Sequence, residues 1–226
     1  MIYFTTIETN KIYAQNNKVN VTDHRFHSYV EQMIGHINAS IDNKRNNNIT
    51  LAIQHALHPV EEIWDKMEYK LSQNGSIASN KILDKLQNYI KILKNDSTTE
   101  AIEEKVKLTE LLRTTINQYV PEEKRLDNKY ILNVTADLID TAQKEYGESM
   151  IDGKIVNIIE YQDGQEFFEQ AISLLKESYN LLTDSQKKVL VQIEEIKKDV
   201  DSKSDPSYVT SDVKDLVCKI KGGIYC

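Results

Sequence analysis

Apolar residues recur at steps of three and four along most of this chain, which is the spacing of a helix that buries one face. The clearest example lies within residues 51–71, where the apolar positions are Ile53, Leu57, Val60, Trp64, Met67 and Leu71. Only 7 glycines and 3 prolines occur among the 226 residues, which leaves little material for the many turns of a β-rich fold. The sequence therefore predicts an all-α protein.

Short polar connections divide the chain into helices. Asn46-Asn47-Asn48 is the first connection, and Asp23 stands where it can cap the helix before it. The expected helices cover about 23–44, 50–73, 77–94, 98–119, 126–146, 165–182, 185–200 and 211–219, with a less regular stretch at 147–163. Helices joined by short loops form antiparallel helical bundles. We predict two four-helix bundles in tandem, over 23–120 and 121–226, after a flexible N-terminal arm or signal remnant at 1–22.

Two histidines and a glutamate share one stripe of the second expected helix. His55, His58 and Glu62 fall at i, i+3 and i+7 beside the apolar face, and Glu61 follows His58 by about one turn. Imidazole and carboxylate groups on adjacent turns are what a borderline transition metal takes from a helix. A pair of half-exposed histidines on a bundle helix would show the same spacing, so a metal site is one of two interpretations.

The first connection fixes which residues of the helical hairpin lie opposite one another. His36 and His58 each lie eleven residues from Asn47, at matching heights on antiparallel helices. We therefore expect His36 to meet His55 or His58, whereas the other histidines of the first helix lie two or more turns further along. The second half of the chain supplies further candidate ligands, which are Glu160, Asp163 and Glu166.

Pro59 distorts the helix beside these histidines. Inside a helix it cannot donate a hydrogen bond to the carbonyl of His55, and its ring pushes that turn open. Alternatively, His58 ends one helix and Pro59 begins the next. Both alternatives place an irregular turn next to the candidate ligands.

The charge of the chain narrows the classes of partner. A net charge of −7 argues against binding to nucleic acid and to an anionic membrane surface, and it suits a cation. No apolar run approaches the roughly 18 residues of a membrane span. We therefore expect a metal ion as ligand and no nucleic acid.

Three features favour an exported protein. Cys218 and Cys226 flank a short segment with two glycines, which allows a disulfide in an oxidising compartment. Tyr13-Ala14-Gln15 resembles the end of an export signal. Asn-X-Ser/Thr triplets, which can accept glycans in an exported protein, begin at Asn20, Asn38, Asn48, Asn74, Asn95 and Asn133. Free thiols, a disordered arm and helix-capping Asn residues are the alternatives.

Several short motifs resemble the imelysin-type proteins, helical-bundle components of extracytoplasmic iron uptake. In the second half these motifs are Ala136–Asp140, Glu160–Gln165, Phe168 and Ala171–Leu175. In the first half, His58-Pro59-Val60-Glu61 followed by Ile63 and Trp64 resembles the family's His-x-x-Glu signature. The chain departs from the family at Ala56, where the family has Gly, and in the Pro after the histidine. The resemblance implies two four-helix bundles and an exported iron- or copper-handling protein.

The sequence thus predicts an extracytoplasmic, non-enzymatic protein of metal uptake or handling, with a membrane permease or another protein as partner. Its metal would be iron or copper, with zinc as a further candidate. The expected metal ligands are His58 and Glu61, completed by His55, His36 and Glu62. No catalytic nucleophile–base set and no His-Glu-x-x-His motif is present in the sequence. The alternative is a non-catalytic structural or interaction module, or an accessory subunit of an exported or membrane-associated complex.

Overall fold

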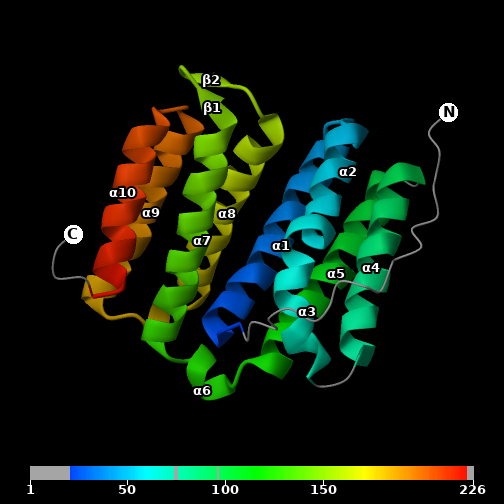
Figure 1. The fold of residues 1–226 in the computed structure, drawn as a ribbon, viewed down its shortest axis with the longest axis horizontal. Helices are drawn as coiled ribbons and strands as arrows, with labels where there is room; N and C mark the ends of the chain where they lie inside the picture. Colours follow the sequence, from blue (N-terminus) through cyan, green and yellow to red (C-terminus); the bar gives the residue numbers. More distant parts are fainter. Residues whose placement is uncertain (1–20, 74–75, 96, 223–226) are drawn as a thin grey trace, which may run out of the picture.

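A computed structural model describes residues 21–73, 76–95 and 97–222 of the chain. Nearly all of these residues are helical, and the all-α prediction is confirmed. Figure 1 shows two groups of helices side by side, which form the two expected four-helix bundles. Within the described residues, none of the helices is both long and apolar enough to cross a membrane.

The first bundle begins with a helical hairpin. Helix α1 (Asp23–Arg45) turns through Asn47, whose φ of 59° is the left-handed conformation that Asn tolerates. The returning segment is one long helix in three parts, α2 (Ile49–His58), the π-helical turn η1 (Pro59–Ile63) and α3 (Trp64–Ser72). Helices α4 (Ser76–Asn95) and α5 (Thr98–Tyr119) complete the bundle. The Pro59 turn is therefore a distortion within a continuous helical path, as in the first of the two alternatives.

The second bundle follows a short helix, α6 (Glu122–Arg125). It contains α7 (Asn128–Ser149), α8 (Ile158–Glu177), α9 (Asp184–Asp201) and α10 (Pro206–Ile220). A small antiparallel hairpin of β1 (Met150–Ile151) and β2 (Lys154–Ile155) joins α7 to α8, and the 3-10 turn η2 (Tyr179–Leu181) lies between α8 and α9. Helix α1 lies against α7 and α8, so it links the two bundles (Figure 1).

Helix α8 begins earlier than the sequence predicted. The expected start was Gln165, after an irregular stretch, but the helix starts at Ile158, where Asn157 caps it by accepting a hydrogen bond from the backbone of Ile159 at 3.2 Å. Gly164 lies between the irregular stretch expected at 147–163 and the helix expected from Gln165. In the structure Gly164 lies inside α8. A Cβ at this position would stand only 3.0 Å from the carbonyl oxygen of Ala142 on α7, so a larger residue would not fit. Gly164 allows two backbones to approach closely.

A second glycine acts in the same way at the joint between the bundles. A Cβ on Gly35 of α1 would lie 2.9 Å from the ring of Phe167 on α8. Phe167 and its neighbour Phe168 are buried in the core. The two glycines therefore bring α1, α7 and α8 close together.

The role expected for Asp23 was wrong in one respect. Thr22 occupies the position that precedes α1, and Asp23 is the first residue of the helix. Its carboxylate pairs with Lys70 of α3 and, at 2.6 Å, with Lys124 of α6. Asp23 thus ties the start of α1 to two neighbouring elements.

Several predictions about export concern residues beyond those described. Residues 1–20 of the N-terminal arm, Cys226, and parts of the triplets that begin at Asn20, Asn74 and Asn95 lie outside the described residues. Asn48 caps α2 by accepting a hydrogen bond from the backbone of Leu51 at 3.3 Å. The third residues of two other triplets, Ser40 and Thr135, are buried and bonded to the backbone of their own helices. Helix capping and packing thus account for these triplets without a glycan, and glycosylation stays a prediction.

Candidate metal centre

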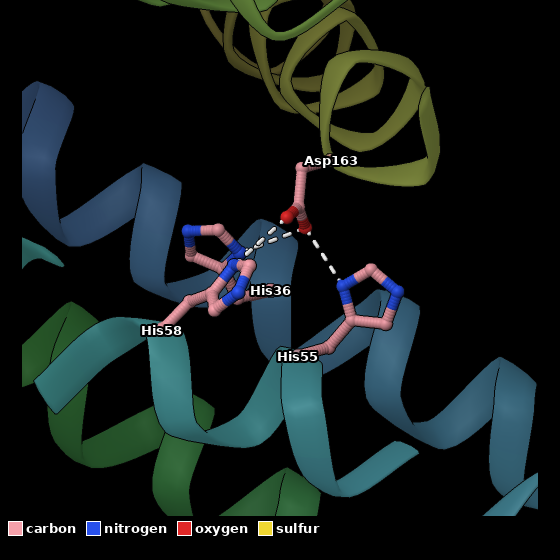
Figure 2. A group of neighbouring side chains, drawn as sticks. All are labelled: His36, His55, His58 and Asp163. Carbon is pink, nitrogen blue, oxygen red and sulfur yellow. Dashed lines mark hydrogen bonds and ion pairs between the residues drawn. The ribbon is translucent and has the colours of Figure 1, made fainter. Parts of the chain in front are cut away.

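Three histidines of the first bundle surround one aspartate of the second. Asp163 of α8 is fully buried, and its carboxylate lies 2.7 Å from Nδ1 of His36, 2.9 Å from Nδ1 of His55 and 3.0 Å from Nδ1 of His58. Figure 2 shows Asp163 pointing from α8 onto the hairpin, with His36 and His58 together on one side and His55 on the other. The same ring nitrogen of all three histidines is directed at one carboxylate.

The hairpin accounts for the meeting of the histidines. His55 and His58 lie one turn apart on α2, and the structure brings His36 of α1 beside them, with 5.0 Å between the ring centres of His36 and His58. Asp163 then enters from α8 because Gly35 and Gly164 allow that helix to pack closely against α1 and α7. The centre therefore depends on both bundles.

The donor atoms are close enough to share a metal ion. One ligand atom from each of His36, His55, His58 and Asp163 can be chosen so that all four lie within 4.8 Å of one another. Bonds of about 2.0–2.1 Å in a tetrahedral site would separate such atoms by roughly 3.3 Å, so small side-chain rotations suffice. Three imidazole nitrogens and one carboxylate oxygen are a donor set that suits iron, zinc or copper.

The charges of the centre support one another. Burial alone would raise the pKa of Asp163, but the charge of His36 and the hydrogen bonds from all three histidines hold that pKa well below its usual value. Burial would likewise lower the pKa of His58, yet the hydrogen bond and charge of Asp163, together with Glu62 and Glu160, raise it. A metal ion that binds His58 therefore competes with a proton that this environment favours.

Neighbouring side chains hold the histidine rings in place. Nε2 of His55 lies 2.8 Å from Oε1 of Gln162, which also accepts a hydrogen bond from Asn43 at 2.9 Å. The ring of His36 packs edge-on against Phe167, with 4.9 Å between ring centres. An outer hydrogen bond that fixes the ring and leaves the inner nitrogen for the metal is usual for histidine ligands.

The two glutamates predicted as ligands lie differently. Glu62 lies at the edge of the centre, with its Oε1 3.6 Å from Nδ1 of His58, and its side chain is 42% exposed. Glu61 is exposed and does not belong to the four-residue group. The π-helical turn explains this difference, because it widens the helix after His58 and changes which residue faces the centre.

The other candidate residues lie outside the four-residue group. Glu166 is half-buried, and burial followed by the charges of Asp42 and Glu169 raises its pKa to about 7. Glu160 lies beside Glu145 of α7, which the sequence did not single out. Burial, and then the hydrogen bond and charge of Glu160, raise the pKa of Glu145 to about 9. This environment favours the protonated form of Glu145.

Asp163 was one of three second-half carboxylates considered from the sequence, and nothing there distinguished it. A helix predicted to begin at Ile158, as α8 does, would have placed Glu160 and Asp163 on the same face. The irregular stretch predicted at 147–163 concealed that face.

Comparison with known proteins gives one match. A family model described as the iron permease-associated 4-helix bundle domain matches residues 121–224. These residues form the second bundle, which includes Asp163, whereas the three histidines of the centre precede them. No curated protein and no solved structure matches the chain. The match supports a helical bundle related to iron uptake.

Proposed function

We propose that this chain is a non-enzymatic protein that binds one transition-metal ion for uptake, with His36, His55, His58 and Asp163 as ligands. The observation that carries the proposal is the convergence of three Nδ1 atoms on one fully buried carboxylate. Buried clusters of this kind are costly unless every charge is paired, and such residues concentrate at functional sites.

Iron is the metal that the similarity favours. The matched family is named for association with an iron permease, and a mixed imidazole–carboxylate set suits Fe²⁺. Copper binds most such sites more tightly, and zinc accepts the same ligands, so both are competitors that a titration must include. When bound, the ion would add a positive charge that holds α8 against the hairpin.

In this proposal the chain acts outside the cytoplasm and delivers its ion to a membrane permease. The name of the matched family supports the permease, and the spacing of Cys218 and Cys226 supports export. The likeness to imelysin-type proteins belongs to the same proposal. In this chain the ligands on that helix would be His55 and His58, rather than the His58 and Glu61 of the family's signature, because Glu61 is exposed.

Metal titration of the purified protein tests the proposal. The metal-free protein is titrated with Fe²⁺ under argon, and in parallel with Zn²⁺ and Cu²⁺, and the bound metal is measured by elemental analysis. We expect one ion per chain. Removal of residues that only support a ligand typically costs about 10–100-fold in affinity, so Asp163→Asn, which changes a ligand, is expected to cost at least about 100-fold.

His27→Gln is the matched control. His27 is a buried histidine of α1, the helix that carries His36, but its Nδ1 contacts the hydroxyl of Tyr130 at 3.2 Å and it lies outside the centre. This variant should bind metal as the wild type does. Equal metal binding by Asp163→Asn and His27→Gln would contradict the assignment of the ligands.

One observation favours the alternative of an interaction module. Ile151, Val156 and Ile158 are large apolar side chains exposed around the hairpin that joins α7 to α8. A protein that only docks through this end would bind a partner equally well with or without metal. Wild-type protein that takes up no ion in the titration would favour this second function.

A further inference from the structure

The metal centre is closed on one side. On the side of His55, the outer ring nitrogen is held by Gln162, and Gln162 is in turn bonded to Asn43. His55 itself is fully buried. An ion that reaches Asp163 from this side would have to break both hydrogen bonds.

The opposite side of the centre opens into a cavity. This cavity has a volume of about 300 Å³ and lies between α1, η1 and α7. His36 and Phe167 line it on the side of the centre, and its lining also includes Glu62, Thr141 and Glu145. In Figure 2, His36 and His58 stand together on one side of Asp163, so a path along His36 arrives at both rings.

Glu62 is the exposed carboxylate of this cavity that remains available to a cation, since Glu145 is half-buried and lies against Glu160. Asp140 is paired with Lys144 at 2.6 Å, and Asp137 is bonded to His24 at 2.7 Å. Arg25 and Lys66 also line the cavity, so the lining as a whole is not strongly acidic. Within the described residues, Glu62 forms no ion pair with a lysine or arginine, and its carboxylate lies between solvent and Nδ1 of His58.

We propose that this cavity is the route by which a hydrated divalent cation enters the centre, and that Glu62 is the first residue to hold the ion before it passes to His58 and His36. The inference rests on the proposed metal-binding function and adds the path and the form of the metal. A partly exposed carboxylate can exchange with the waters of the ion, whereas the buried ligands can only receive an ion that has already lost some of them.

The size of the cavity specifies the class of substrate. A volume of about 300 Å³ holds roughly ten water molecules, which is enough for an ion and its first shell of water. It stands at the lower limit of the pockets that enclose drug-sized organic ligands, at roughly 300–1,000 Å³. The cavity therefore fits a hydrated metal ion better than a bulky organic iron chelate.

Filling the cavity gives the sharpest test, because a route affects rates and leaves the equilibrium alone. In Thr141→Phe a half-exposed residue of the lining is enlarged without any change to a ligand. Thr109→Phe is the matched control, since Thr109 lines a separate cavity on α5. Binding of Co²⁺ to the full chain is followed by stopped-flow absorbance, and release is followed after addition of a chelator.

We expect the association and dissociation rates of Thr141→Phe to fall together by about tenfold, with an unchanged ratio and hence an unchanged Kd. Thr109→Phe should keep the wild-type rates. Glu62→Gln should slow association several-fold and weaken the dependence of that rate on salt. The substitution removes the negative charge of the carboxylate that attracts the entering ion.

The outcomes separate the route from the site. Wild-type protein that binds no Co²⁺ would contradict the metal-binding function itself. Thr141→Phe with wild-type rates, or with faster dissociation and a weaker Kd, would contradict the route while the metal centre stands. Transfer of iron from a bulky ferric chelate as fast as from free Fe²⁺ would contradict the class of substrate.

Discussion

Helix α1 makes two histidine–aspartate contacts with the second bundle, and they share little except their length. His24 meets Asp137 of α7 and His36 meets Asp163 of α8, each at 2.7 Å. The side chains of the first pair are 32% and 13% exposed, whereas those of the second pair are 2% and 0% exposed. His24 is the single histidine bonded to Asp137, with Lys221 at 3.7 Å, whereas two further histidines reach Asp163.

The difference shows what separates a surface ion pair from a candidate metal centre. At the first pair, water and a nearby lysine compensate the charges, so the contact adds little free energy. Among the described residues, the carboxylate of the second pair has only imidazole partners, in a region of low dielectric constant, so each contact is stronger and each missing partner costs more. Each contact joins one histidine to one aspartate over the same distance. The second contact differs because its side chains are buried and because further histidines converge on its aspartate.

The largest expected effect comes from removing each aspartate in turn. Asp163→Ala should lower the free energy of unfolding of the metal-free protein by about 3–5 kcal/mol, because it leaves a group of buried histidines without their acceptor. Asp137→Ala should lower it by less than about 1 kcal/mol. Urea denaturation of both variants measures this, and equal losses would show that the two contacts do not differ in kind.

The next effect concerns the close packing that brings Asp163 into the centre. Gly164→Ala should destabilise the protein by about 1–3 kcal/mol, because its Cβ would press on the backbone of Ala142 and Tyr146, at 3.0 and 3.1 Å. It should also weaken metal binding, since Asp163 would be displaced. Gly147→Ala is the matched control on α7, where a Cβ meets nothing within 4 Å. That variant should gain about 0.5–1 kcal/mol from helix propensity, and the reverse order would contradict the packing argument.

The smallest effect is a dependence of stability on pH. The raised pKa of His58 means that its contribution is complete below its usual value of 6.5 and is lost as the pH rises through the raised value. The lowered pKa of Asp163 means that its contribution is present above 3.8 and is lost as the pH falls through the lowered value. Contributions from the centre should therefore be greatest between about pH 4 and 6.5.

Thermal unfolding of metal-free protein at pH 5.5 and pH 8.5 measures this dependence. The wild type should lose more stability than Asp163→Ala over that interval, because Asp163 raises the pKa of His58. Asp137→Ala should follow the wild type. The raised pKa of Glu145, about 9, adds a loss in the same direction, which Glu145→Gln would remove. A wild type and an Asp163→Ala variant with the same pH dependence would refute the expected coupling.

The helices of this protein could be predicted because their signal is local. Apolar residues at three- and four-residue steps, with Asn, Ser and Thr at the connections, require no knowledge of the partner helix. The helix over Thr98–Tyr119 was predicted with the bounds that it has in α5, and α1 extends only to Arg45 beyond the expected Lys44. Counting residues from Asn47 also predicted that His36 meets the histidines of α2, because rise per residue is fixed in a helix.

The sequence could not select Asp163, because its place in the centre depends on contacts between distant residues, and it did not distinguish Glu61 from Glu62. A glycine such as Gly164 often ends a helix. Its close contact with the backbone of α7, which the sequence does not reveal, explains why a glycine occupies this position inside α8. The π-helical turn after Pro59 changes which glutamate faces the centre, and helical spacing alone assumes a regular turn. The sequence therefore determined the helices and the histidine stripe, whereas the tertiary structure decided which carboxylate the histidines surround, since packing between α1, α7 and α8 sets that distance.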